Sequence, residues 1–91
     1  MKNSNFNNVL VSEVSNFLQE YMMKNNIDTL TADNCAELLG NSNILSNKVG
    51  PKKGFNFRQM LRDGRDEKIN LVDGAFQERP KTKWFLNKII R

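Results

Sequence analysis

The sequence predicts an α+β fold in which three helices are followed by a small antiparallel β-hairpin or three-stranded sheet. In three segments between Val11 and Leu61 the apolar residues fall on one side of a helix, at three- and four-residue steps in the first of them. Beyond Asp66 they alternate with polar residues, as in half-buried strands. A chain of 91 residues can bury one small core. We therefore expect a single domain over residues 11–91, preceded by a disordered tail over residues 1–10.

The first helix is expected over residues 12–24, with Ser12 as its N-cap. Asn25 and Asn26 are expected to end it, because Asn tolerates the left-handed conformation found at helix C-termini. Its apolar stripe consists of Val11, Val14, Phe17, Leu18, Tyr21 and Met22. The second helix is expected over residues 32–39, with Thr31 as its cap and Gly40 as its stop.

A loop of about 16 residues, rich in Asn, Ser, Gly and Pro and made basic by its lysines, leads to the third helix. A loop of that length predicts either a short strand or helical turn near Ile44 and Leu45, or a functional role. The third helix is expected over residues 57–63. Asn56 and Gln59 have the spacing of a capping box, and Gly64 is expected to end the helix.

The last third of the chain has the pattern of strands. Residues 69–72 and 75–77 flank Asp73-Gly74, a pair typical of a two-residue hairpin turn. Residues 78–83, ERPKTK, then connect to a final strand. We expect Trp84 and Leu86 to share its buried face, and Phe76 to be buried with them.

The charge of +4 is unevenly distributed along the chain. Residues 1–47 carry two cations and five acids, whereas residues 48–91 carry twelve cations and five acids. A basic half of this kind is typical of a surface for a polyanion, most often nucleic acid, although it can also serve solubility alone.

The residue types present favour a binding protein over an enzyme. The absence of histidine and the single Cys35 exclude a zinc site, so we expect no metal and no cofactor. There is no histidine for general-base catalysis, and the five glycines form no phosphate-binding motif. Without a signal peptide or a long apolar segment, we expect a cytoplasmic protein with no membrane partner.

Three segments in succession resemble a known DNA-binding family. They are TLTADNCAELLG, FRQMLRDGRD and INLVDGAFQERPKTKWFLNKI, spanning residues 29–89. Their order resembles the winged helix-turn-helix of the excisionase and mercury-resistance-regulator type. The resemblance implies a winged-helix-like domain that binds double-stranded DNA, with helix 57–63 in the major groove and residues 78–83 as a basic wing. Such a protein would be a small transcription regulator or an accessory domain of a DNA-processing protein.

Nine residues are the candidate DNA contacts. Arg matches the acceptors of guanine, and Asn and Gln match adenine, so helix residues of these types can read base edges, while wing cations neutralise phosphates. Pro80 would stiffen the wing. The candidates are Lys52, Lys53, Asn56, Arg58, Gln59, Arg62, Arg79, Lys81 and Lys83.

Other interpretations remain open at this stage. The same scaffold could be a protein–protein interaction module, in which the hairpin cations protect a sheet edge. Trp84 and Phe85, interleaved with cations, could instead stack on unpaired bases. A homodimer would read paired half-sites, and fusion to a larger DNA-processing protein is the other arrangement considered.

Overall fold

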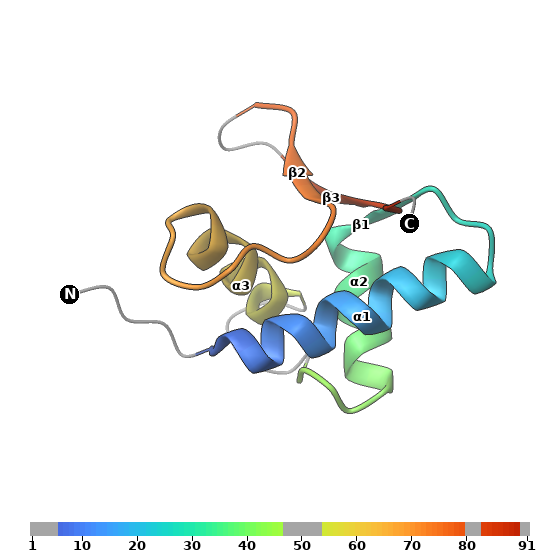
Figure 1. Cartoon of the computed structure of the whole chain (residues 1–91), viewed down its shortest axis with the longest axis horizontal. Helices are drawn as coiled ribbons and strands as arrows, with labels where there is room; N and C mark the ends of the chain where they lie inside the picture. Colours follow the sequence, from blue (N-terminus) through green and yellow to red (C-terminus); the bar gives the residue numbers. More distant parts are fainter. Residues whose placement is uncertain (1–5, 47–53, 80–82, 90–91) are drawn as a thin grey trace.

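The computed structural model describes residues 6–46, 54–79 and 83–89. It confirms an α+β fold with three helices and a three-stranded antiparallel sheet. Figure 1 shows α1 lying across α2 and α3, with the sheet beside the helices and the β2–β3 hairpin projecting away from them. The elements are α1 (Asn8–Lys24), β1 (Thr29–Thr31), α2 (Ala32–Asn41), α3 (Phe55–Arg65), β2 (Ala75–Gln77) and β3 (Trp84–Asn87).

Helix α1 begins one turn earlier than the sequence predicted. Asn7, not Ser12, is its N-cap, and the Asn7 side chain accepts a hydrogen bond of 2.8 Å from the Leu10 N–H. The expected tail over residues 1–10 was therefore too long, since residues 8–10 are helical. The predicted end is confirmed, because Asn25 is the C-cap and Asn26 has φ 53°.

Helix α2 begins as expected and ends later. Thr31 forms a reciprocal capping box with Asn34, which satisfies backbone groups at the helix start. Gly40 does not end the helix, which continues to Asn41 with Ser42 as its C-cap. Beyond it Leu45 is buried, so this end of the loop is anchored in the core.

Helix α3 is longer than expected at both ends. The expected Asn56–Gln59 capping box is wrong: Gly54 is the N-cap, and the Asn56 side chain donates to the Ser46 carbonyl at 3.1 Å. Gly64 does not end the helix either. It lies within the last turn and is buried against the backbone of Leu71, where a side chain would not fit.

The sheet has the order β1–β3–β2, with β3 in the centre. The prediction of a strand over residues 69–72 is wrong, because these residues form no strand. Strand β2 pairs with β3, and the other edge of β3 pairs with β1, a strand that was not predicted. Asp73-Gly74 is consequently no hairpin turn. The two-stranded hairpin consists of β2 and β3, connected by residues 78–83 as expected.

Alternation along the strands places different aromatic residues on the two sheet faces. Trp84 and Leu86 are buried, as predicted. Phe76 was expected to be buried but is only half-buried. It is the register partner of Phe85 on the outer face, and the two rings stack with centroids 5.7 Å apart.

One hydrophobic core is shared by the helices and the inner sheet face. The largest fully buried side chains are Phe57, Leu18, Met22, Leu39, Met60, Leu61, Leu86, Val14, Val72 and Cys35. Burial raises the pKa of the Cys35 thiol to about 12, so this thiol is protonated and enclosed.

A buried polar side chain ties α1 to the sheet. The Gln19 amide donates to the carbonyls of Asp73 (3.0 Å) and Asn87 (2.9 Å), and its oxygen accepts from the Ile89 N–H at 2.8 Å. Ser15 accepts from the Asp73 N–H at 3.0 Å. These bonds join α1 to the segments that precede β2 and follow β3.

Candidate nucleic-acid interface

The outward side of α3 carries most of the polar residues expected on this helix. Phe57, Met60 and Leu61 are buried against the core. Arg58 and Arg62 lie on the opposite side and are half-buried. Of the four candidates on this helix, Asn56 is hydrogen-bonded to Ser46 in the loop. The other three, Arg58, Gln59 and Arg62, lie along the outward side of the helix.

Side-chain contacts within α3 hold two of these candidates in place. The Gln59 amide donates to the Asp63 carboxylate at 2.8 Å, and the Gln59 oxygen accepts from Arg62 at 2.8 Å. The Arg62 guanidinium also lies over the Phe55 ring, 5.4 Å from its centroid. These contacts limit the rotamers of Gln59 and Arg62, so both are presented from α3 in a defined geometry.

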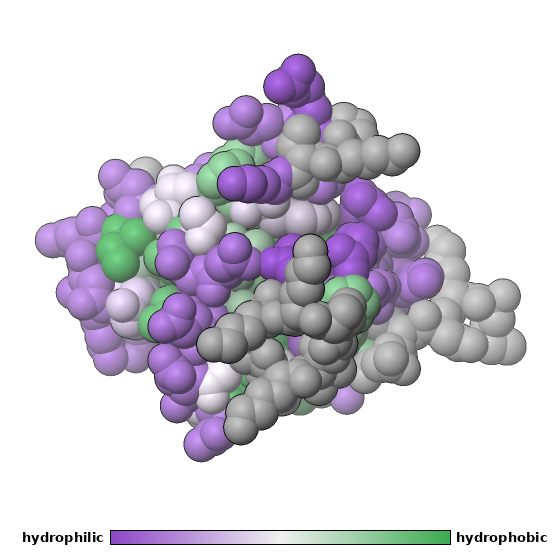
Figure 2. Space-filling view, turned by 180° about the vertical axis from the view of Figure 1, so that it is seen from behind, coloured by the Kyte–Doolittle hydropathy of each residue, from purple (hydrophilic) through white to green (hydrophobic). Residues whose placement is uncertain are grey.

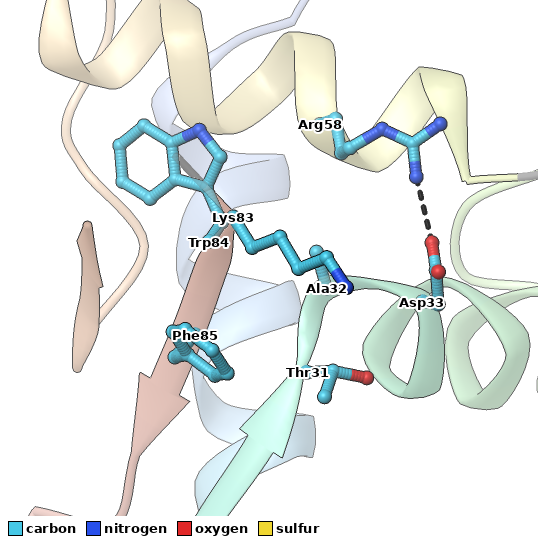
Figure 3. A pocket seen from close by; sticks show the side chains of 7 residues that line it. All are labelled: Thr31, Ala32, Asp33, Arg58, Lys83, Trp84 and Phe85. Carbon is cyan, nitrogen blue, oxygen red and sulfur yellow. Dashed lines mark hydrogen bonds and ion pairs between the residues drawn. The ribbon is translucent and has the colours of Figure 1, made fainter. Parts of the chain in front are cut away.

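Arg58 is joined to the start of α2 by an ion pair. Its Nη1 atom lies 2.6 Å from Oδ1 of Asp33, and Figure 3 shows the guanidinium reaching from α3 to this carboxylate. The Asp33 side chain is 78% exposed, against 26% for Arg58. An exposed pair of this kind contributes little stability, so solvent or a ligand can compete for either partner.

Arg58 also lines an open pocket of about 340 Å³, which we call the Arg58–Lys83 pocket. Its walls come from four elements: the end of β1, α2, α3 and the segment that begins β3. Lys83 extends across it from the start of β3 towards α2 (Figure 3). The lining residues are Thr31, Ala32, Asp33, Arg58, Lys83, Trp84 and Phe85.

A second open pocket of about 380 Å³ joins the end of α3 to the hairpin, and we call it the Arg65–Arg79 pocket. Trp84 lines both pockets, so the two pockets adjoin at this residue. The lining residues are Arg65, Leu71, Ala75, Phe76, Gln77, Glu78, Arg79 and Trp84.

The fold therefore brings helix and hairpin cations together. Arg58 and Lys83 both line one pocket, and Arg65 and Arg79 both line the other. Glu78 and Asp33 add one acid to each pocket, so neither is purely basic. The remaining candidates, Lys52, Lys53 and Lys81, lie outside the described residues, as does Pro80.

Two residues of this surface were missed by the sequence analysis. Arg65 lies seven positions after Arg58 and three after Arg62, spacings that keep it on their side of a helix. It was overlooked because Gly64 was expected to end that helix. Asp33 reaches Arg58 only through the packing of α2 on α3, and no local pattern indicates that contact.

In comparisons with models of protein families, with curated proteins and with solved structures, no match to this chain was found. Within residues 6–46, 54–79 and 83–89, no helix combines the length and the apolar character needed to cross a bilayer.

Proposed function

We propose that the chain is a winged helix-turn-helix domain that binds double-stranded DNA, with α3 in the major groove and residues 78–83 as the wing. The observation that carries this proposal is that cations of the helix and of the hairpin line the same two pockets, which share Trp84. Phosphates spaced along a DNA strand would meet positive charge from both elements at once.

The shape of the elements supports the same interaction. An α-helix is about 10–12 Å wide with its side chains, and the major groove of B-DNA is about 12 Å wide. Helix α3 has 11 residues, packs against α2 and is followed by the β2–β3 hairpin. In this arrangement Gln59 and Arg62 face base edges, where their hydrogen-bonding groups match adenine and guanine.

The remaining cations would contact the sugar-phosphate backbone. Arg58 and Lys83 lie at one end of the surface, and Arg65 and Arg79 at the other. Such contacts fix orientation, while base contacts give sequence preference. The protein would act in the cytoplasm as a small transcription regulator or as an accessory domain of a DNA-processing protein, without catalysis of its own.

The exposed large hydrophobic side chains of the described residues are few, although Leu71 lines the Arg65–Arg79 pocket beside the half-buried Phe76. The large hydrophobic side chains exposed among the described residues are Val9, Met23 and Leu71. Val9 and Met23 lie near opposite ends of α1. From behind, the coloured part of the surface is mainly hydrophilic, with separate hydrophobic patches (Figure 2). A docking site for a protein usually needs a contiguous apolar patch.

We expect duplex binding with a strong salt dependence. If four cations each neutralise one phosphate, affinity falls about 100-fold between roughly 50 and 200 mM salt. Fluorescence anisotropy with a labelled duplex measures this. Arg62→Ala should weaken binding, whereas Lys24→Ala, at the end of α1 and paired with Glu20, should not. Absence of duplex binding at 50 mM salt would overturn the proposal.

Removing the acid beside Arg58 should strengthen DNA binding. Asp33→Asn abolishes a negative charge in the Arg58–Lys83 pocket and releases Arg58 from its ion pair. We expect about fivefold tighter binding, the equivalent of ~1 kcal/mol for one charge at close range in water.

The matched control for this variant is Glu13→Gln on the exposed side of α1, which removes the same charge away from the pocket. Asp33 lies in the first turn of α2, so its loss should lower stability slightly, and thermal unfolding of the variant checks this. Equal gains from both variants would mean that overall charge, and not the pocket, controls affinity.

A further inference from the structure

The Arg58–Lys83 pocket combines chemical groups that a fully paired duplex does not use together. Two cations reach it from different elements, one from α3 and one from the segment before β3. Phe85 offers an aromatic ring, and Asp33 offers an exposed carboxylate. A ligand that fits all of these groups carries an anion, a flat aromatic ring and hydrogen-bond donors.

We propose that this pocket receives one unpaired nucleotide, so that the protein prefers duplex DNA containing a bulged base over fully paired DNA. The inference rests on the proposed duplex binding and defines the DNA structure that is recognised. The pocket volume of about 340 Å³ falls within the range usual for small-molecule sites.

Lys83, Phe85 and Asp33 each have a defined part in holding the nucleotide. Lys83 is exposed and forms no ion pair among the described residues, so it is the contact for the 5′ phosphate. The base stacks on the Phe85 ring, which is already held by stacking against Phe76. The Asp33 carboxylate accepts a hydrogen bond from an exocyclic amino group, as carboxylates do from cytosine.

A preference for bulged DNA follows from the cost of exposing a base. Within a duplex both faces of each base are covered by its neighbours, and extruding one costs a few kcal/mol. A bulged nucleotide has no pairing partner to lose, so more of the stacking energy on Phe85 appears as affinity. Alanine scanning of comparable stacking platforms indicates an effect of about tenfold or more per base.

The test compares three duplexes of identical sequence by anisotropy competition: fully paired, with one bulged adenine, and with an abasic bulge. We expect the bulged adenine duplex to bind about tenfold tighter than the paired duplex, and the abasic one to match the paired duplex. Phe85→Leu keeps an apolar side chain against Phe76 but removes the stacking face, so it should abolish the preference for the bulged duplex.

Phe17→Leu is the control, because Phe17 is a half-buried phenylalanine on α1, outside the pocket. It should retain the preference for the bulge. If wild-type protein binds paired and bulged duplexes equally, the inference fails while duplex binding stands. An equal gain with the abasic bulge also overturns it, because duplex flexibility would then explain the preference. If none of the three duplexes binds, the proposed function itself fails.

Discussion

Replacing Gln19 with alanine is expected to lower the free energy of unfolding by about 3 kcal/mol. The variant removes the hydrogen bonds to the carbonyls of Asp73 and Asn87 and the bond from the Ile89 N–H. All three partner groups belong to the backbone and are left next to a cavity in the core. Each unsatisfied buried polar group costs about 1–3 kcal/mol. Because the three groups regain some contact with water, we expect a cost near the lower limit for each, or about 3 kcal/mol in total.

Urea denaturation followed by circular dichroism measures this loss. The control is Asn16→Ala, at an exposed position on the same helix, which should stay within about 0.5 kcal/mol of the wild type. Cys35 gives an independent readout, because its buried thiol should react with a thiol reagent faster when the core opens more often. A loss below about 1 kcal/mol would show that the Gln19 bonds contribute little net stability.

Gly74→Ala is expected to destabilise the protein by about 3 kcal/mol or more. Gly74 has φ 85°, a region that costs an L-residue roughly 1–2 kcal/mol. A Cβ atom here would also overlap the Asn87 carbonyl oxygen. The Asn87 N–H donates to the Gly74 carbonyl at 2.9 Å, so the two backbone segments are held against each other and β3 must shift to admit a side chain.

Gly54→Ala separates the two contributions. Gly54 has the same φ of 85°, but a Cβ atom there would meet only the ends of the Arg58 and Asp33 side chains, which can move. We expect a loss of about 1–2 kcal/mol for Gly54→Ala, from backbone strain alone. Thermal unfolding of both variants decides between the explanations. If the two variants lose the same free energy of unfolding, the overlap between the new Cβ atom and the Asn87 carbonyl contributes less than backbone strain does.

These two positions also affect the candidate interface. Gln19 and Gly74 both contact Asn87 at the end of β3, and Lys83 and Trp84 lie at the other end of that strand segment. The position of β3 therefore sets where the hairpin cations lie relative to α3. Variants at the junction that still fold should weaken duplex binding without removing a charge.

Local sequence signals predicted the features that depend on residues close together in the chain. The cap at Thr31 and the end of α1 at Asn25 involve neighbours within four residues, and both were predicted, although the reciprocal bond from Asn34 was not. The three helices, the alternation that buries Trp84 and Leu86, and the connection over residues 78–83 are of the same kind. Each is set by periodicity or by a cap, which the chain carries by itself.

Predictions from local pattern were wrong where contacts between distant segments determine the structure. Gly64 has the chemistry of a helix stop, but in the structure it is needed for the close approach of Leu71. Strand β1 has three residues, too few for a two-residue period to be recognised, and it exists because β3 offers a pairing edge. Phe76 left the core because its register partner on β3 is Phe85 and not Trp84.

By itself, then, the sequence determined the α+β class, the approximate position of each helix and the basic character of the second half of the chain. Only the tertiary structure decided which cations meet. Lys83 lies 25 positions after Arg58 in the sequence, and Asp33, the ion-pair partner of Arg58, lies 25 positions before it. Contacts over such distances follow from packing and strand register, which depend on the whole core and not on any local pattern.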